Sequence, residues 1–145
     1  MVRFAKEEED FDWCYKLACH EDKLLGPCLP FPLRERMQCG EVAVTDDKTA
    51  FCEFHVAKKF GHISVYHICT APEARKQGKA RELLEFLRAN FEYPIQAVCI
   101  TGTSSEDFWS RVAKKVDTKY SKTGTELSVF RIGEEIKRLK KEVLF

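Results

Sequence analysis

Residues 70–87 read TAPEARKQGKARELLEFL and join an apolar run to a segment whose leucines recur at helical spacing. The first amides of a helix have no partner within the helix, and the helix dipole adds partial positive charge there. Arg75, Lys76 and Lys79 contribute further positive charge, which attracts anions. Gly78 allows the backbone to approach a ligand without an intervening side chain. The stretch predicts either a phosphate-binding turn or a solvated polar loop before an ordinary helix.

The composition is that of a folded globular protein. The chain has 145 residues, of which 44% are apolar and 32% are charged, and its net charge is +1. We expect one domain spanning residues 1–145, with a single core. A nearly neutral chain has no overall field that would attract nucleic acid, so nucleic-acid binding is not expected.

The chain carries no signal for a membrane or for secretion. No stretch approaches the about 20 apolar residues of a membrane span, and the acidic start MVRFAKEEEDFDW does not suit a secretory signal. The seven cysteines are scattered and include no C-x-x-C pair, which suits reduced thiols better than a disulfide framework or a zinc site. We expect a cytoplasmic protein with no membrane partner and no bound metal.

In the first half of the chain, hydrophobic periodicity predicts mainly strands. A short strand near residues 2–4 is followed by an amphipathic helix over residues 7–19. Three prolines between residues 26 and 40 indicate a loop or a broken helix there. Three runs rich in β-branched and aromatic residues then predict an antiparallel meander over residues 41–47, 49–59 and 61–70.

In the second half, helices and strands alternate. A helix is predicted from Gly78 to about Asn90, and an almost wholly apolar strand over residues 95–102 follows it. Such a strand suits burial on both faces and a helical crossover from the strand before it. The other expected elements are a helix over residues 106–116 capped by Ser104 and Ser105, strands over residues 117–120 and 127–132, and a terminal helix over residues 133–145.

The string T-A-P-E-A-R-K-Q-G-K-A resembles, in its spacing, the acyl-CoA-binding segment of the GCN5-related N-acetyltransferase (GNAT) superfamily. In that family x-P is followed by R-x-x-G-x-G or R-x-x-G-x-A, and here the pattern is carried by Thr70, Pro72, Arg75, Gly78 and Ala80. The predicted order of elements agrees with that family over most of the chain. The resemblance implies an α/β (α+β) fold with a central mixed, mostly antiparallel sheet of about six or seven strands, flanked by about four helices.

The resemblance also implies a function, that of an acyl-CoA-dependent N-acyltransferase. Its co-substrate would be acetyl-CoA, and acetyl would pass to a primary amine by direct attack, without a covalent enzyme intermediate. By position, the pantetheine arm would pair with the strand end and the pyrophosphate with the turn. The cofactor residues that this implies are Ile68, Cys69, Thr70, Arg75, Lys76, Gln77, Gly78, Lys79, Ala80, Arg81 and Trp109. The identity of the acceptor amine, on a small molecule or a protein, stays open. Whether the chain forms a homodimer also stays open.

The family's usual proton donor to the thiolate has no counterpart in this sequence. The family often places a tyrosine near the thiol, preceded by an asparagine, whereas Trp109 and Gly102 stand at those positions here. An indole N–H donates a hydrogen bond but is no acid near neutral pH. Ser110 or a water could protonate the thiolate instead. The structural interpretation of Phe108 and Trp109 is that they form core and pocket wall.

Candidate proton acceptors lie on the strand that leads into the motif. By position Tyr66 and Ser64 face the acceptor, and we predict both as catalytic, with Tyr66 first. His67 should point to the other face unless a β-bulge intervenes. His62 and His67 stay open as proton relays, because the segment GHISVYHIC contains no Glu or Asp. An acyl-CoA-binding interaction module without turnover is the alternative function.

Overall fold

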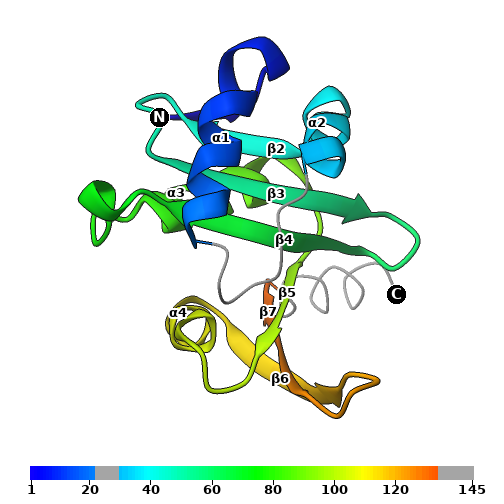
Figure 1. Cartoon of the computed structure of the whole chain (residues 1–145). Helices are drawn as coiled ribbons and strands as arrows, with labels where there is room; N and C mark the ends of the chain where they lie inside the picture. Colours follow the sequence, from blue (N-terminus) through cyan, green and yellow to red (C-terminus); the bar gives the residue numbers. More distant parts are fainter. Residues whose placement is uncertain (22–29, 134–145) are drawn as a thin grey trace.

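The computed structural model describes residues 1–21 and 30–133, whose strands form one mixed sheet (Figure 1). The strand order is β1-β2-β3-β4-β5-β7-β6, and of these neighbours only β4 and β5 are parallel. The strands are β1 (Val2–Phe4), β2 (Val42–Thr45), β3 (Ala50–Ala57), β4 (His62–Thr70), β5 (Ile95–Ile100), β6 (Lys114–Tyr120) and β7 (Glu126–Ile132). The helices are α1 (Glu7–Glu21), α2 (Pro30–Gln38), α3 (Lys79–Asn90) and α4 (Ser104–Val112), with one 3₁₀ turn, η1 (Pro72–Ala74). Within the described residues, the predicted fold class and the antiparallel meander are confirmed.

The helices cover opposite faces of the sheet, with α1 and α2 on the near side of β2 and β3 in Figure 1 and α3 behind them. Successive residues of a strand point to opposite faces, and the core divides accordingly. Val42 and Val44 belong to the buried cluster that includes α1 and α2 residues, whereas Ala43 belongs to the cluster that includes the leucines of α3. None of the described helices has both the length and the apolar character that crossing a membrane requires.

Helix α2 corrects the prediction of a loop or a broken helix for its part of the proline-rich segment. It is a regular helix that begins at Pro30, with Pro32 in its first turn. The first amides of a helix have no intrahelical acceptor, so prolines at those positions remove no hydrogen bond. Leu33 and Met37 then lie one helical turn apart and are buried against the sheet.

Three predictions for the region after α3 are also wrong. Strand β5 is not buried on both faces, because Val98 and Ile100 are 46% and 40% exposed. Helix α4 ends at Val112 instead of near residue 116, since the next residues join β6 and pair with β7. Its N-cap is Thr103 instead of Ser104 or Ser105. The predicted terminal helix lies, beyond residue 133, outside the described residues.

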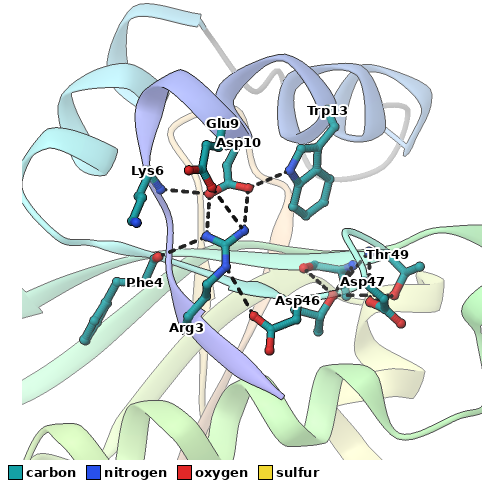
Figure 2. Close-up of polar contacts among 11 residues, drawn as sticks. Arg3, Phe4, Lys6, Glu9, Asp10, Trp13, Asp46, Asp47 and Thr49 are labelled. Carbon is teal, nitrogen blue, oxygen red and sulfur yellow. Dashed lines mark hydrogen bonds and ion pairs between the residues drawn. The ribbon is translucent and has the colours of Figure 1, made fainter.

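A buried ion pair fixes β1 to the start of α1 (Figure 2). Asp10 is fully buried, and its carboxylate accepts hydrogen bonds from Arg3 at 2.7 and 3.1 Å, from the Lys6 amide at 2.8 Å and from Trp13 Nε1 at 2.9 Å. Burial alone would raise the pKa of Asp10, but these hydrogen bonds outweigh it and the pKa lies below its usual range. The same guanidinium reaches Asp46, in the turn after β2, at 3.2 Å. One arginine thus connects the first strand, the first helix and the β2–β3 turn.

Candidate functional site

The sheet opens between β4 and β5. These parallel strands pair only through Ile63↔Ile95, Ser64↔Gln96 and Val65↔Ala97, although β4 continues to Thr70. The pairing stops where a β-bulge interrupts the register of β3 and β4, because Glu53 lies opposite His67 but Phe54 lies opposite Val65. Tyr66 is therefore the extra residue, and a bulge of this kind bends its strand. The two strands diverge beyond this point.

A cavity of about 690 Å³ occupies the space between the diverging strands and extends to the start of α3. Its walls come from β4, the turn before α3, β5 and α4. That volume lies in the range of small-molecule sites. Of the residues predicted to hold a cofactor, the cavity is lined by Ile68, Cys69, Thr70, Arg75, Lys76, Gly78, Lys79, Ala80, Arg81 and Trp109. Gln77 is not among the lining residues, and its side-chain amide donates to the Glu73 carbonyl at 3.4 Å.

The turn before α3 has the backbone geometry of an anion site. Lys76 and Gly78 both adopt left-handed conformations, with φ of 64° and 76°. Gly78 is the N-cap of α3 and offers no side-chain hydrogen bond to the helix, so the first amides are left for another acceptor. The position of a Cβ on Gly78 has no atom within 4 Å. The turn therefore presents backbone amides to open space.

The charges around this turn favour an anion as well. Among the described residues that line the cavity there is no carboxylate. Five lining residues are cations, namely Arg75, Lys76, Lys79, Arg81 and Arg111. Lys79 Nζ also lies 2.9 Å from Asp47 Oδ2, in the β2–β3 turn. Hydrogen bonds from Thr49 and from Lys79 hold the pKa of Asp47 well below its usual range, and the pairing raises the pKa of Lys79. This ion pair connects the β2–β3 turn to the start of α3.

Comparison with solved structures identifies the fold. The structure is similar to that of the ribosomal-protein-S18-alanine N-acetyltransferase from Escherichia coli, with a TM-score of 0.67 and 14% identity, over 91% of this chain and 92% of that one. It is also similar to a GNAT-family acetyltransferase from Bacillus cereus, with a TM-score of 0.69 and 13% identity over 91% and 95% of the two chains. The chain has the GNAT fold. The expectation from residues 70–80 is thus confirmed at the level of the fold.

A third structure with this fold contains coenzyme A. It is an aminoglycoside 6'-N-acetyltransferase complexed with coenzyme A, with a TM-score of 0.73 and 10% identity, over 91% of this chain and 96% of that one. No protein-family model matches the sequence, and no curated protein matches it. The GNAT fold is therefore recognisable in the three-dimensional structure at identities too low for these sequence comparisons.

On the α2 side of the sheet, the bulge brings His67 onto the same face as Ser64. His67 Nδ1 lies 3.0 Å from Glu53 Oε1, and Glu53 is only 4% exposed. Arg36 of α2 places its Nε 2.9 Å from Glu53 Oε2, and its guanidinium carbon lies 4.3 Å from the centre of the Tyr66 ring. A buried carboxylate, an imidazole, a guanidinium and a phenol thus meet next to the point where β4 and β5 separate.

The two predicted catalytic residues have different surroundings in the GNAT fold. Tyr66 lines the cavity and is 46% exposed. Ser64 is not among the lining residues, and its hydroxyl lies 3.0 Å from His62 Nε2. The β-bulge on which the orientation of His67 depended is present, and it turns His67 toward the face of Ser64.

Glu53 and Arg36 were not predicted from the sequence, because a carboxylate was expected only on β4. A signal was present, since Glu53 interrupts the apolar run AFCEF of a central strand. An acid in such a place is either paired or functional.

Trp109 and Gly102 are the residues predicted from the sequence to stand where the family often has a tyrosine and an asparagine. Trp109 is 5% exposed, packs edge-on against Phe108 with ring centres 5.0 Å apart, and forms part of the cavity wall. Gly102 has φ of 85°, and its amide donates to Glu106 Oε1 at 3.2 Å, which supports the start of α4. The expectation that Phe108 and Trp109 serve as core and wall agrees with this packing.

Proposed function

We propose that the chain is an acyl-CoA-dependent N-acyltransferase, with acetyl-CoA as co-substrate and a primary amine as acceptor. The observation that carries the proposal is the cavity between β4 and β5, which runs from a cationic helix N-terminus to the point where the strands separate. An extended ligand in this cavity would have its phosphate end at the cationic helix N-terminus and its thioester end at the point where the strands separate. The GNAT fold of the chain supports the same function.

The residues that line the cavity suit such a co-substrate. Backbone amides from residues 76 to 81 and the cations beside them would hold the pyrophosphate. Ile68, Cys69 and Thr70 lie beyond the last residue pair between β4 and β5, so their backbone can pair with the pantetheine arm as a strand would. Acetyl-CoA supplies an activated acyl group when it is bound. The protein's part is to orient the acceptor and to remove its proton.

We assign the removal of that proton to His67, with Glu53 as a positioning residue. A carboxylate 3.0 Å from Nδ1 accepts the proton of that nitrogen, which leaves Nε2 of a neutral imidazole to accept another. Arg36 keeps Glu53 in place by an ion pair at 2.9 Å. Tyr66, the first prediction from the sequence, lines the cavity and packs against the Arg36 guanidinium, and its hydroxyl can orient the acceptor or a water. Ser64 stays a prediction with a lesser role.

One observation favours a second function, that of an acyl-CoA-binding interaction module. The buried Trp109 is predicted to stand where the family often has a tyrosine, and an indole N–H is no acid near neutral pH, so it would offer no proton to a leaving thiolate. Such a module would bind acetyl-CoA without turnover. A thiolate is a good leaving group near neutral pH and can depart without an acid to protonate it. We therefore favour the enzyme.

The test combines binding and turnover. Acetyl-CoA at 100 times its Kd should raise Tm by roughly 5–10 °C, because it binds only the folded state. Gly78→Trp should remove that shift, whereas the matched control Gly124→Trp should keep it, since Gly124 has a similar φ of 84° and equally open surroundings in another turn. Release of thiol from acetyl-CoA is then followed over a panel of amines and proteins.

The results separate the two functions. Thiol release that depends on one acceptor class supports the enzyme and names its substrate. A Tm shift with no thiol release over the whole panel supports the binding module instead. An unchanged Tm at millimolar acetyl-CoA would refute both.

A further inference from the structure

The cavity between β4 and β5 contains few side chains that could give a proton to a leaving thiolate. Among the described residues that line it there is no carboxylate and no histidine. Arginine keeps its proton in proteins, and the hydroxyls of serine and threonine are no acids near neutral pH. The other ionisable side chains of the described lining are the phenol of Tyr66, the thiol of Cys69 and the ammonium groups of Lys76 and Lys79.

Position separates Tyr66 from the other three. Lys76 lies in the turn before α3 and Lys79 begins that helix, where we place the pyrophosphate. Cys69 is 6% exposed and belongs to the buried cluster on the α1 side of the sheet. Tyr66 is the first residue of β4 beyond its last pair with β5, and it is 46% exposed. It therefore lies at the end of the cavity where we place the thioester.

Helix α4 offers no alternative acid among the described residues. Ser110, which the sequence suggested for this role, is exposed and does not line the cavity. The residues of α4 that do line it carry hydroxyl, aromatic, aliphatic and guanidinium groups. None of these groups gives up a proton near neutral pH.

The surroundings of Tyr66 suit the loss of its proton. The guanidinium carbon of Arg36, on α2, lies 4.3 Å from the centre of its ring, which places positive charge beside the phenolate that proton donation would leave. Arg36 pairs in turn with Glu53 of β3 at 2.9 Å, and His67 of β4 lies 3.0 Å from the same carboxylate. The described residues of β5 that line the cavity carry no charge.

We propose that Tyr66 is the general acid that protonates the sulfur of coenzyme A, an inference that rests on the proposed acyltransferase function. The acceptor nitrogen bonds to the carbonyl carbon of the thioester and the carbon–sulfur bond breaks. His67 Nε2 takes the proton of the amine, and Tyr66 Oη gives its own proton to the sulfur. Water then carries a proton from the imidazolium to the phenolate, so one proton passes in total from the amine to the thiol.

The β-bulge allows this division of roles. It places two consecutive residues of β4 on the α2 side of the sheet, where the Tyr66 ring meets Arg36 and His67 meets Glu53. A thiolate also departs without help, so the acid adds a modest factor to the rate.

The test changes the acidity of the phenol and keeps its ring and hydroxyl. Tyr66 is replaced by 3,5-difluorotyrosine, and kcat for thiol release is measured against pH. The fall of kcat at high pH should move toward neutral pH by roughly two pH units, because this limb of the profile reports the pKa of the essential acid. Tyr66→Phe should abolish the limb and lower kcat about tenfold. The same fluorinated residue at Tyr120, which is 67% exposed on β6, is the matched control and should leave the profile unchanged.

The outcomes distinguish the acid from the enzyme. A limb that does not move in the fluorinated chain, or that persists in Tyr66→Phe, would overturn the acid and leave the acyltransferase in place. A higher KM for the acceptor with an unmoved limb would likewise overturn it and assign the hydroxyl to acceptor orientation. No thiol release by the unmodified chain with any acceptor would refute the acid together with the proposed function. Melting curves verify that each variant folds, and Tyr66→Phe, which keeps the ring against Arg36, serves if the fluorinated chain does not.

Discussion

His67 and Glu53 lie on adjacent strands, with Nδ1 of the histidine 3.0 Å from Oε1 of the glutamate, although 14 residues separate them in the chain. The contact exists because a bulge at Tyr66 shifts the register of β4 against β3. Without the bulge, alternation along β4 would direct His67 to the α3 side, away from α2. The proposed proton acceptor is therefore a product of strand register.

Replacing His67 tests this acceptor directly. His67→Gln should lower kcat by about 10²- to 10⁴-fold, the usual range for the loss of a general base. Glu53→Gln should cause a smaller loss, because it removes the charge but keeps an acceptor for the proton on Nδ1. His62→Gln, on the same strand, is the matched control and should stay within twofold. An unchanged kcat in His67→Gln would remove this residue from the mechanism.

The contributions of the Tyr66 ring and of its hydroxyl can be tested separately. Tyr66→Phe keeps the ring against Arg36, whose guanidinium carbon lies 4.3 Å from its centre, and removes only the hydroxyl. We expect kcat to fall about tenfold with the KM for acetyl-CoA unchanged, as for the loss of an interaction made only in the transition state. Tyr66→Ala should also raise the KM for the acceptor. Equal kinetics of Tyr66→Phe and the unmodified chain would assign the residue a structural role.

Removing the charge of Lys79 or of Asp47 should change the affinity for acetyl-CoA in opposite directions. Lys79→Gln removes a cation from the cavity wall and should weaken binding about fivefold at low salt. Asp47→Asn removes a negative charge beside the proposed pyrophosphate position and should strengthen binding about twofold. Both effects should diminish as the salt concentration rises, because screening weakens exposed charges. Calorimetric titrations at two salt concentrations measure them, and weaker binding in both variants would show that the pair orders the turn.

The buried Asp10 predicts a dependence of stability on pH. Because its pKa in the folded state is lowered, its contribution is complete above the unfolded pKa of about 3.9 and is lost as pH falls through the folded pKa. Asp10→Asn should cost about 2 kcal/mol at pH 7, less than a fully buried pair because Arg3 is partly exposed. The variant should also lose less stability than the unmodified chain below about pH 4.

A matched control for Asp10 is available on the same arginine. Asp46 pairs with Arg3 Nε at 3.2 Å but is half-exposed, so Asp46→Asn should cost under about 0.5 kcal/mol. Urea denaturation at pH 7 and pH 3 measures both variants. Equal losses for Asp10→Asn and Asp46→Asn at pH 7 would contradict the role given to burial.

The elements whose signals are local could be predicted from the amino-acid sequence. Gly78 and the leucine period after it predicted α3, and the alternation in residues 41–70 predicted the meander, because turn chemistry and side-chain periodicity act over a few residues. The motif carried by Arg75, Gly78 and Ala80 likewise predicted the turn that lines the cavity. Prolines misled the prediction for α2, since their effect depends on which turn of the helix they occupy.

Features that depend on partners far along the chain could not be predicted and follow from the folded sheet. Residues 114–116 joined a strand because β7 offered them hydrogen bonds, and Val98, just beyond the last β4–β5 pair, is exposed. Glu53 could be recognised as the partner of His67 only once the bulge had fixed their register. Long-range pairing and register are properties of the assembled sheet, so no short window of sequence contains them. The local sequence thus specified the turn that we propose for the donor, and the sheet decided which side chains lie beside the proposed acceptor position.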